Sequence, residues 1–224
     1  MNCQKSIIQS ICTNHIIDIN LNRSYNIFWK TIFPKETQVI NYNSDNDCGS
    51  VLMYDLFIRL RRNIPSVYDM KKQLTHAYKP LINLYSTKIL DILSKQNNKY
   101  KMIEQVINNQ VSLETLIMSE QYYLTDLDLW LLCDLYKLPV LLISDNSLDS
   151  LSINVPWLVL GGNKDVDVYY CVSNKKQDNL PGYNLINFGL SMSKMDNFRI
   201  LLDDPEYAGH ALTIDSYLET YSIM

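Results

Sequence analysis

A polar stretch that turns into an amphipathic helix, residues 41–62, constrains the fold of this chain more than any other segment. Asn, Asp, Gly and Ser dominate positions 43–50, and these residue types favour turns and helix caps over helix interiors. Apolar side chains then recur at helical spacing, at Met53, Leu56, Phe57 and Leu60. We therefore expect a helix that begins near Cys48 and buries one apolar face.

Cys48 would lie in the first turn of this helix, where a thiol can do chemistry. Free amides and the positive end of the helix dipole favour thiolate over thiol, which increases the nucleophilic fraction at neutral pH. The same pattern also fits a small buried cysteine, a common environment for this residue type. The 5 cysteines form no CxxC pair, so we expect reduced thiols and neither disulfides nor structural zinc, with Cys133 and Cys171 as packing residues.

Composition limits the function classes. The 224 residues are 47% hydrophobic and 20% charged, which predicts a folded chain with one substantial domain. A formal net charge of -4 gives no general attraction to nucleic acid or to an anionic membrane. The sequence has neither a secretion signal nor the roughly 18 consecutive apolar residues of a membrane span, so we expect a cytoplasmic protein without nucleic-acid or membrane partners. The one basic cluster, Arg59, Arg61 and Arg62, falls where cations would cap the end of the first helix.

Patterns elsewhere in the first half predict strands and then a helical layer. Alternation and β-branched residues favour extended structure at 15–22, 25–33 and 37–42. Ser66 and Asp69 have capping-box-like spacing for a helix that Pro80 should end. Further apolar helical faces cover 82–93, 103–107 and 113–117.

The strongest local signal lies at 119–144. Thr125 and Asp128 have the spacing of a capping box for a helix that Pro139 stops, and the apolar run 140–143 is typical of a buried strand. Two further strands, 157–160 and 166–172, are separated by Gly161-Gly162-Asn163. This spacing predicts that they pair as a hairpin.

Together these features resemble the ovarian tumour (OTU) family of cysteine peptidases. The resemblance rests on the D-x-x-C turn at 45–48, the helical middle, the aromatic, capped helix and strand at 122–143, and the closing hairpin. It covers about residues 37–188 and is closest in style to OTU-like segments in proteins of large DNA viruses. The resemblance implies an α+β fold related to papain-like peptidases, a small central sheet packed by a helical layer. Residues 1–36 would then be an extended arm or strands, and 189–224 a C-terminal arm.

OTU enzymes remove ubiquitin by acyl transfer, so the resemblance makes Cys48 the nucleophile and puts Asp45 in the oxyanion-binding turn. It implies no cofactor and no metal, and a partner that is ubiquitin or a ubiquitin-like protein, in the host cytoplasm if the chain is viral. The family's histidine lies in an H-Y-[ND] segment on a late strand. The corresponding stretch reads PGYN, where Gly182 aligns with the histidine and Asn184 with the residue that orients it. His210, downstream of the nucleophile, is the remaining candidate base.

Two further departures separate the chain from the family pattern. Gly49-Ser50 follows the cysteine where bulkier residues are usual, and Tyr122-Tyr123-Leu124 replaces a Trp-Gly-Gly type turn. His15 and His76 are expected to be structural or solvated. Three hypotheses stay open: a deubiquitinase that uses Cys48 and His210, a catalytically silent OTU-like module that binds ubiquitin or another protein, and an unrelated α/β scaffold with a buried cysteine.

Overall fold

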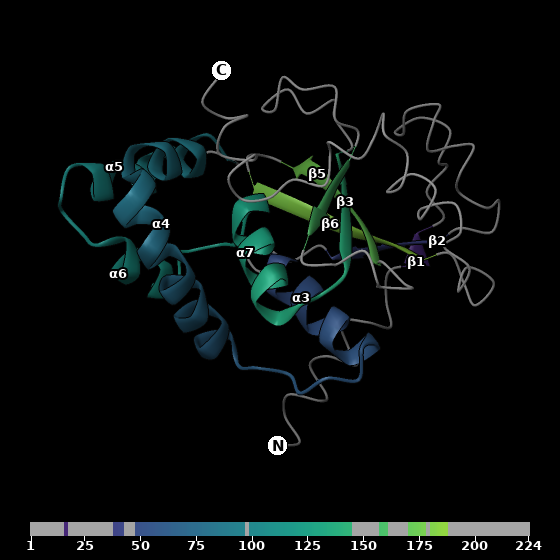
Figure 1. Ribbon diagram of the computed structural model, residues 1–224. Helices are drawn as coiled ribbons and strands as arrows, with labels where there is room; N and C mark the ends of the chain where they lie inside the picture. Colours follow the sequence, from purple (N-terminus) through teal and green to yellow (C-terminus); the bar gives the residue numbers. More distant parts are fainter. Residues whose placement is uncertain are drawn as a thin grey trace, which may run out of the picture.

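The computed structural model describes residues 16–17, 38–42, 48–96, 99–144, 157–160, 170–177 and 180–187. This part of the chain is a mixed α+β structure in which helices cover a 6-stranded sheet (Figure 1). The strand order is β1-β2-β6-β5-β3-β4, and every neighbouring pair is antiparallel except β3 and β5, which are parallel. The expected α+β class is confirmed at this level.

Most expected elements are present close to their expected bounds. The strands are β1 (Ile16–Ile17), β2 (Gln38–Tyr42), β3 (Val140–Ser144), β4 (Trp157–Leu160), β5 (Tyr170–Gln177) and β6 (Leu180–Asn187). The helices are α3 (Cys48–Arg59), α4 (Val67–Lys95), α5 (Tyr100–Ile107), α6 (Leu113–Met118) and α7 (Asp126–Tyr136). The predicted helix start at Cys48 and the predicted buried strand after Pro139 are therefore confirmed. The expected strand at 25–33 lies outside the described residues.

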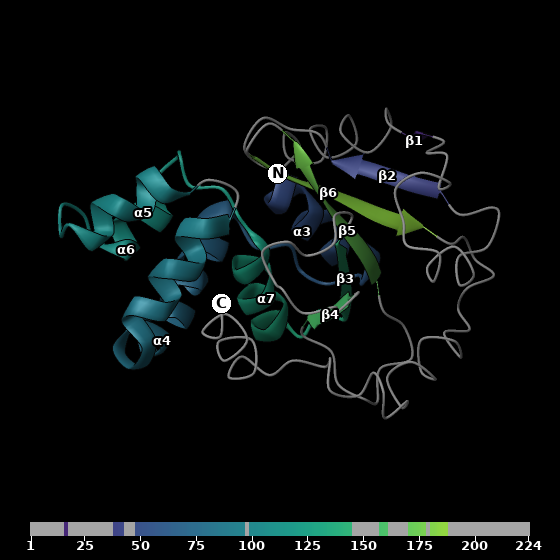
Figure 2. The same cartoon turned by 90° about the horizontal axis from the view of Figure 1, so that it is seen from above.

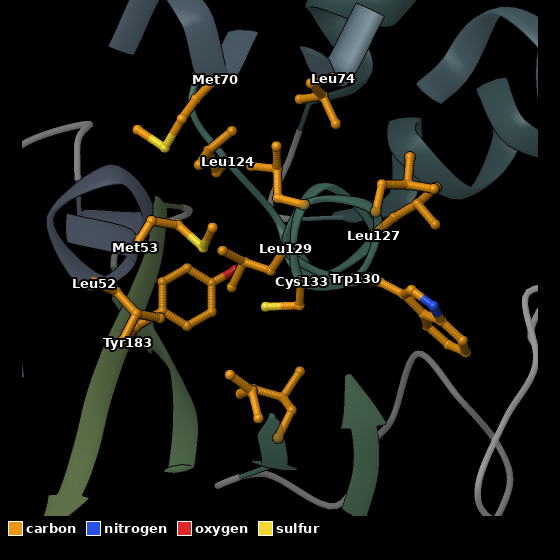
Figure 3. Close-up of a cluster of buried hydrophobic side chains, with 14 of the residues drawn as sticks. Leu52, Met53, Met70, Leu74, Leu124, Leu127, Leu129, Trp130, Cys133 and Tyr183 are labelled. Carbon is orange, nitrogen blue, oxygen red and sulfur yellow. The ribbon is translucent and has the colours of Figure 1, made fainter. Parts of the chain in front are cut away.

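The elements form successive layers. Helices α3 and α7 lie between the sheet and the group α4, α5 and α6, which gathers on one side of the molecule (Figures 1 and 2). The core fills the space between these layers: Figure 3 shows Leu52 and Met53 of α3, Leu129 and Cys133 of α7, and Tyr183 of β6 converging on one another. Burial of this shared apolar surface is the main force that joins the helices to the sheet.

The predicted hairpin of 157–160 and 166–172 is wrong. β4 pairs antiparallel with β3, and β5 pairs parallel with β3 from the other side, so these two strands flank β3 instead of pairing with each other. β5 forms its hairpin with β6. The glycine-rich turn indicates only local structure, whereas strand order depends on which apolar faces pack against the helices. Val172 of β5 and Leu185 of β6 lie opposite each other, and both side chains belong to the core.

The prediction that Pro80 ends the second helix is also wrong. α4 continues through Pro80 and leaves helical geometry only at Tyr85, where φ is -136° and ψ is 33°. Proline removes one backbone donor and crowds the preceding turn, which normally bends or ends a helix. Buried side chains occur on both sides of the break, and this shared core keeps the two segments joined: Met70, Leu74, Tyr78, Ile89, Ile92 and Leu93. Ser66 caps the start as expected, with its Oγ accepting from the Asp69 amide at 3.0 Å.

A single buried carboxylate, Asp128 in the first turn of α7, accepts five hydrogen bonds. Its Oδ1 accepts from the phenols of Tyr78 and Tyr122, each at 2.7 Å. Its Oδ2 accepts from Lys99 Nζ at 2.6 Å, and from the backbone amide and hydroxyl of Thr125 at 2.7 and 2.9 Å. The Thr125 amide bond is the one expected from the capping-box spacing.

The partner cation, Lys99, is buried as completely as Asp128. Its ammonium group also donates to the Thr125 hydroxyl at 3.0 Å and lies 4.0 Å from the centroid of the Tyr122 ring. Burial lowers the pKa of Lys99, while the charge of Asp128 opposes that shift. Buried charges persist only when they are paired and hydrogen-bonded, so this network fixes how α4, the segment before α5 and α7 meet.

Loss of the Asp128 charge should destabilise the fold strongly. We expect Asp128→Asn to lower the free energy of unfolding by about 3–5 kcal/mol, because it leaves the buried Lys99 without a counter-charge. Asp134→Asn is the matched control on the same helix, since Asp134 pairs with Lys137 at an exposed position. The control should change stability by less than about 1 kcal/mol. Urea denaturation measures both; similar small losses would contradict a structural role for the buried pair.

The buried thiol of Cys133 makes stability sensitive to alkaline pH. Burial raises the pKa of Cys133, so in the folded state the thiol keeps its proton above the unfolded-state pKa of about 8.5. A raised folded pKa stabilises below the unfolded value, and that stabilisation is lost as pH rises. Above about pH 8.5 the stability of wild type relative to Cys133→Ala should therefore fall by roughly 1.4 kcal/mol per pH unit. Urea denaturation from pH 7 to 10 measures this; a difference independent of pH would contradict it.

Candidate functional site

The path of β2 brings Cys48 to one end of β6. β2 pairs with β6 and ends at Tyr42, which lies opposite Tyr183. After residues 43–47 the chain begins α3 at Cys48. α3 contacts β6, and the residues of β6 just beyond that last pair are Gly182 and Pro181. Because β2 pairs with β6 and α3 then packs on β6, Cys48 contacts Pro181 although the two residues are 133 positions apart.

Two opposing influences act on the Cys48 thiol. It lies in the first turn of α3, a turn without acidic residues, and the helix start favours a thiolate. However, its Sγ donates to the carbonyl oxygen of Pro181 at 2.6 Å, and only a protonated thiol can donate this bond. Cys48 is also 2% exposed. In this structure Cys48 is therefore a shielded thiol at a helix start.

Gly182 and Asn184 share the face of β6 that Tyr183 does not, because side chains alternate along a strand. In the sheet Gly182 lies opposite Lys175, and Asn184 lies between Asn41 and Ser173. Asn184 is buried. The structure thus places Cys48 against Pro181, next to the glycine aligned with the family's histidine, while Asn184 lies two residues further along β6.

The other predicted site residues are not in this cluster. Asp45 and His210 lie outside the described residues, as does His15. His76 is the only histidine in the described part of the chain, and it is exposed on α4 as expected. The described residues therefore place the Cys48 thiol beside the start of β6, and the imidazole assignment stays a prediction.

Tyr183 fixes β6 to α7, a contact that the sequence did not predict. Its hydroxyl donates to Oδ1 of Asp126, in the first turn of α7, at 2.9 Å. Figure 3 shows the ring between Leu52 and Met53 of α3 and the α7 helix, with the hydroxyl directed toward α7. Burial raises the pKa of Tyr183, and the nearby Asp126 and Cys48 raise it further. No local pattern links Tyr183 to Asp126, because they are 57 residues apart.

The two sequence departures beside the cysteine contact each other. A Cβ atom at Gly49 would lie 2.7 Å from Cβ of Leu124, closer than side chains pack, so a larger residue does not fit there. The side chain of Leu124 occupies the space that a bulkier residue after Cys48 would need. A small residue at one position is therefore matched by a large one at the other.

The basic cluster acts only in part as expected: Arg59 lies in the last turn of α3, but Arg62 binds elsewhere. Arg59 forms an ion pair with Asp55 on its own helix, Nε to Oδ2 at 2.7 Å, and Tyr42 also donates to this carboxylate. The guanidinium of Arg62 donates to the carbonyls of Tyr136 and Lys137. Arg62 therefore caps the end of α7 and not, as predicted, the end of α3. A long arginine side chain reaches a neighbouring helix end, which sequence spacing alone cannot indicate.

The described residues contain neither a metal-binding cluster nor a membrane-spanning helix. No three His, Cys, Asp or Glu side chains gather there in a way that could hold a metal ion. None of the helices in the described ranges is long and apolar enough to cross a membrane.

Comparisons with protein-family models, with curated proteins and with solved structures each returned no match. The likeness to OTU peptidases consequently rests on residues of this chain alone. Those that the structure describes are Cys48 at a helix start, the PGYN stretch on β6, and the capped helix α7 followed by β3.

Proposed function

We propose that residues 37–188 form an OTU-like cysteine peptidase domain in which Cys48 occupies the nucleophile position. The observation that supports this most is the junction of α3 and β6, where Cys48 in the first turn of a helix contacts the strand that carries Gly182 and Asn184. A thiol peptidase requires a nucleophile, amide donors and a base around one carbonyl group. By the resemblance, the substrate is ubiquitin or a ubiquitin-like protein.

In the active form of this proposal, the Cys48 thiolate attacks the carbonyl carbon of an isopeptide bond. A base takes the thiol proton and returns it to the departing amine, and water then hydrolyses the thioester. Backbone amides around the start of α3 stabilise the negative charge that develops on the carbonyl oxygen. His210 is the candidate base, because the family order places the base after the nucleophile and His76 is exposed on α4.

The second candidate is a catalytically silent module of the same fold. Two observations favour it: glycine stands at position 182, and the Cys48 thiol is buried and donates to the Pro181 carbonyl. A thiol in this state is not a nucleophile, so the domain would bind ubiquitin or another protein without cleaving it. The burial of Cys48 also fits the third hypothesis, an unrelated scaffold with a buried cysteine.

A ubiquitin probe with an electrophile at its C-terminus distinguishes these forms. An active domain should form one covalent adduct, mapped to Cys48 by mass spectrometry, and the adduct should be absent in Cys48→Ala. Cys133→Ala is the control, since that thiol is buried in α7. His210→Ala should slow labelling by about 10²–10⁴-fold if this histidine is the base.

The absence of labelling separates the silent module from an incorrect proposal. If the probe does not react but an NMR titration shows that ubiquitin binds, the silent module is supported. If the probe does not react and ubiquitin does not bind, or if labelling is unchanged in Cys48→Ala, the proposal is wrong.

A further inference from the structure

The ends of α3 and α7 meet the start of α4 at one place, which we call the three-helix junction. The Phe57 and Tyr136 rings stack edge to face with centroids 5.0 Å apart, and Arg62 donates to the last carbonyls of α7. Asp69, in the first turn of α4, is close enough to Tyr136 to raise the pKa of that phenol, although burial is the larger cause. The consecutive helices α3 and α4 therefore lie close to the end of the sequence-distant helix α7.

Exposed apolar side chains are concentrated on the residues that flank this junction. Of the seven large apolar side chains exposed in the described part of the chain, four lie at the helix ends that meet here or in the segment that joins α3 to α4: Ile58, Ile64, Tyr68 and Leu135. Single exposed apolar residues are ordinary, but several around one junction are typical of a binding surface. Tyr68 is the most exposed of the four, at 61%. Aromatic side chains of this kind often anchor protein interfaces.

The junction is also positively charged on a chain with a net charge of -4. Residues 59–72 contain five Lys and Arg residues and one Asp. Arg59 and Arg62 have partners within the fold, but the guanidinium of Arg61 has no hydrogen bond or ion pair among the described residues. A cation on an exposed apolar surface complements a carboxylate on a partner, and it would disfavour contact with a second basic surface.

Backbone geometry indicates that the Arg61 cation is not required for folding. The Arg62 amide donates to the Phe57 carbonyl at 2.9 Å and the Arg61 amide to the Ile58 carbonyl at 3.0 Å, which is the Schellman end of a helix. Arg61 has φ of 52° in this motif, where glycine is the least strained residue. Among the described residues, Arg61 is therefore a cation without a side-chain partner at a position where a neutral glycine would be more stable.

We propose that the three-helix junction is a docking surface for a partner protein segment that presents carboxylates beside apolar side chains. The apolar residues supply buried contact area, Tyr68 supplies the aromatic anchor, and Arg61 pairs with an acidic group at the rim. The surface lies at the ends of α3 and α7, whereas Cys48 lies at the start of α3, so docking here leaves the proposed peptidase site accessible.

A phage-displayed library of random peptides, selected on the immobilised full chain, tests this directly. Selected peptides should combine Asp or Glu with aromatic or aliphatic residues. Their affinity should fall about three- to fivefold in Arg61→Gly, the loss of one rim charge pair, and more than about tenfold in Arg61→Gly combined with Tyr68→Ser.

Two matched variants separate binding from folding. Asn109→Gly makes the same glycine change at another Schellman position, where φ is 55°, and Leu84→Ser removes a side chain that is 71% exposed on α4 outside the junction. Neither should alter peptide affinity. Failure to enrich peptides, enrichment of basic peptides, or equal binding to all variants would overturn the proposal. The proposal would also be overturned if the chain bound single-stranded DNA in a salt-sensitive way, and if this binding were lost in Arg61→Gly but unchanged in Tyr68→Ser.

Discussion

The carboxylate of Asp128 is the interaction on which the helical layers depend. A fully buried charge is tolerated only if its donors are held in place, and Asp128 receives them from α4, from Lys99 before α5 and from the turn before α7. Apolar packing would permit these helices to slide or rotate against one another, whereas five directed hydrogen bonds select one arrangement. The position of the first turn of α7 follows from this arrangement.

That first turn of α7 connects the helical layers to the proposed site. Asp126, two residues before Asp128, accepts a hydrogen bond from Tyr183, and Tyr183 immediately follows the Pro181-Gly182 segment beside Cys48. Gly49 and Leu124 pack in direct contact on the other side of the cysteine. The β6 segment that contacts Cys48 and the residue that follows Cys48, Gly49, are thus held in place by Asp126 in α7 and by Leu124 just before it. The site is positioned by long-range contacts although its most visible sequence feature, the D-x-x-C turn, is local.

The sequence predicted the local features of the fold and not the contacts between residues far apart in the chain. Helix starts at Cys48, Ser66 and Thr125 were predictable, because turn residues, capping spacing and apolar periodicity are read within one or two turns. The β5–β6 hairpin, the continuation of α4 through Pro80 and the burial of Lys99 were not, because each depends on surfaces distant in sequence. For the site, the resemblance indicated Cys48, Gly182 and Asn184; the structure places Cys48 in contact with Pro181, beside Gly182 on β6, and the roles of these residues stay predictions. It did not indicate the Tyr183–Asp126 contact or the thiol bond to Pro181.

The central proposal is that Gly182 on β6 stands where the OTU family carries the base that serves the cysteine, whether or not the natural chain is active. The most direct measurement is the rate of Cys48 alkylation by iodoacetamide against pH, resolved by peptide mass spectrometry, in Gly182→His and Gly182→Gln. The glutamine variant controls for added volume in the sheet. The account predicts that only the histidine variant accelerates Cys48 alkylation near neutral pH, with a step close to the ordinary histidine pKa of about 6.5. Identical profiles in two folded variants would contradict it.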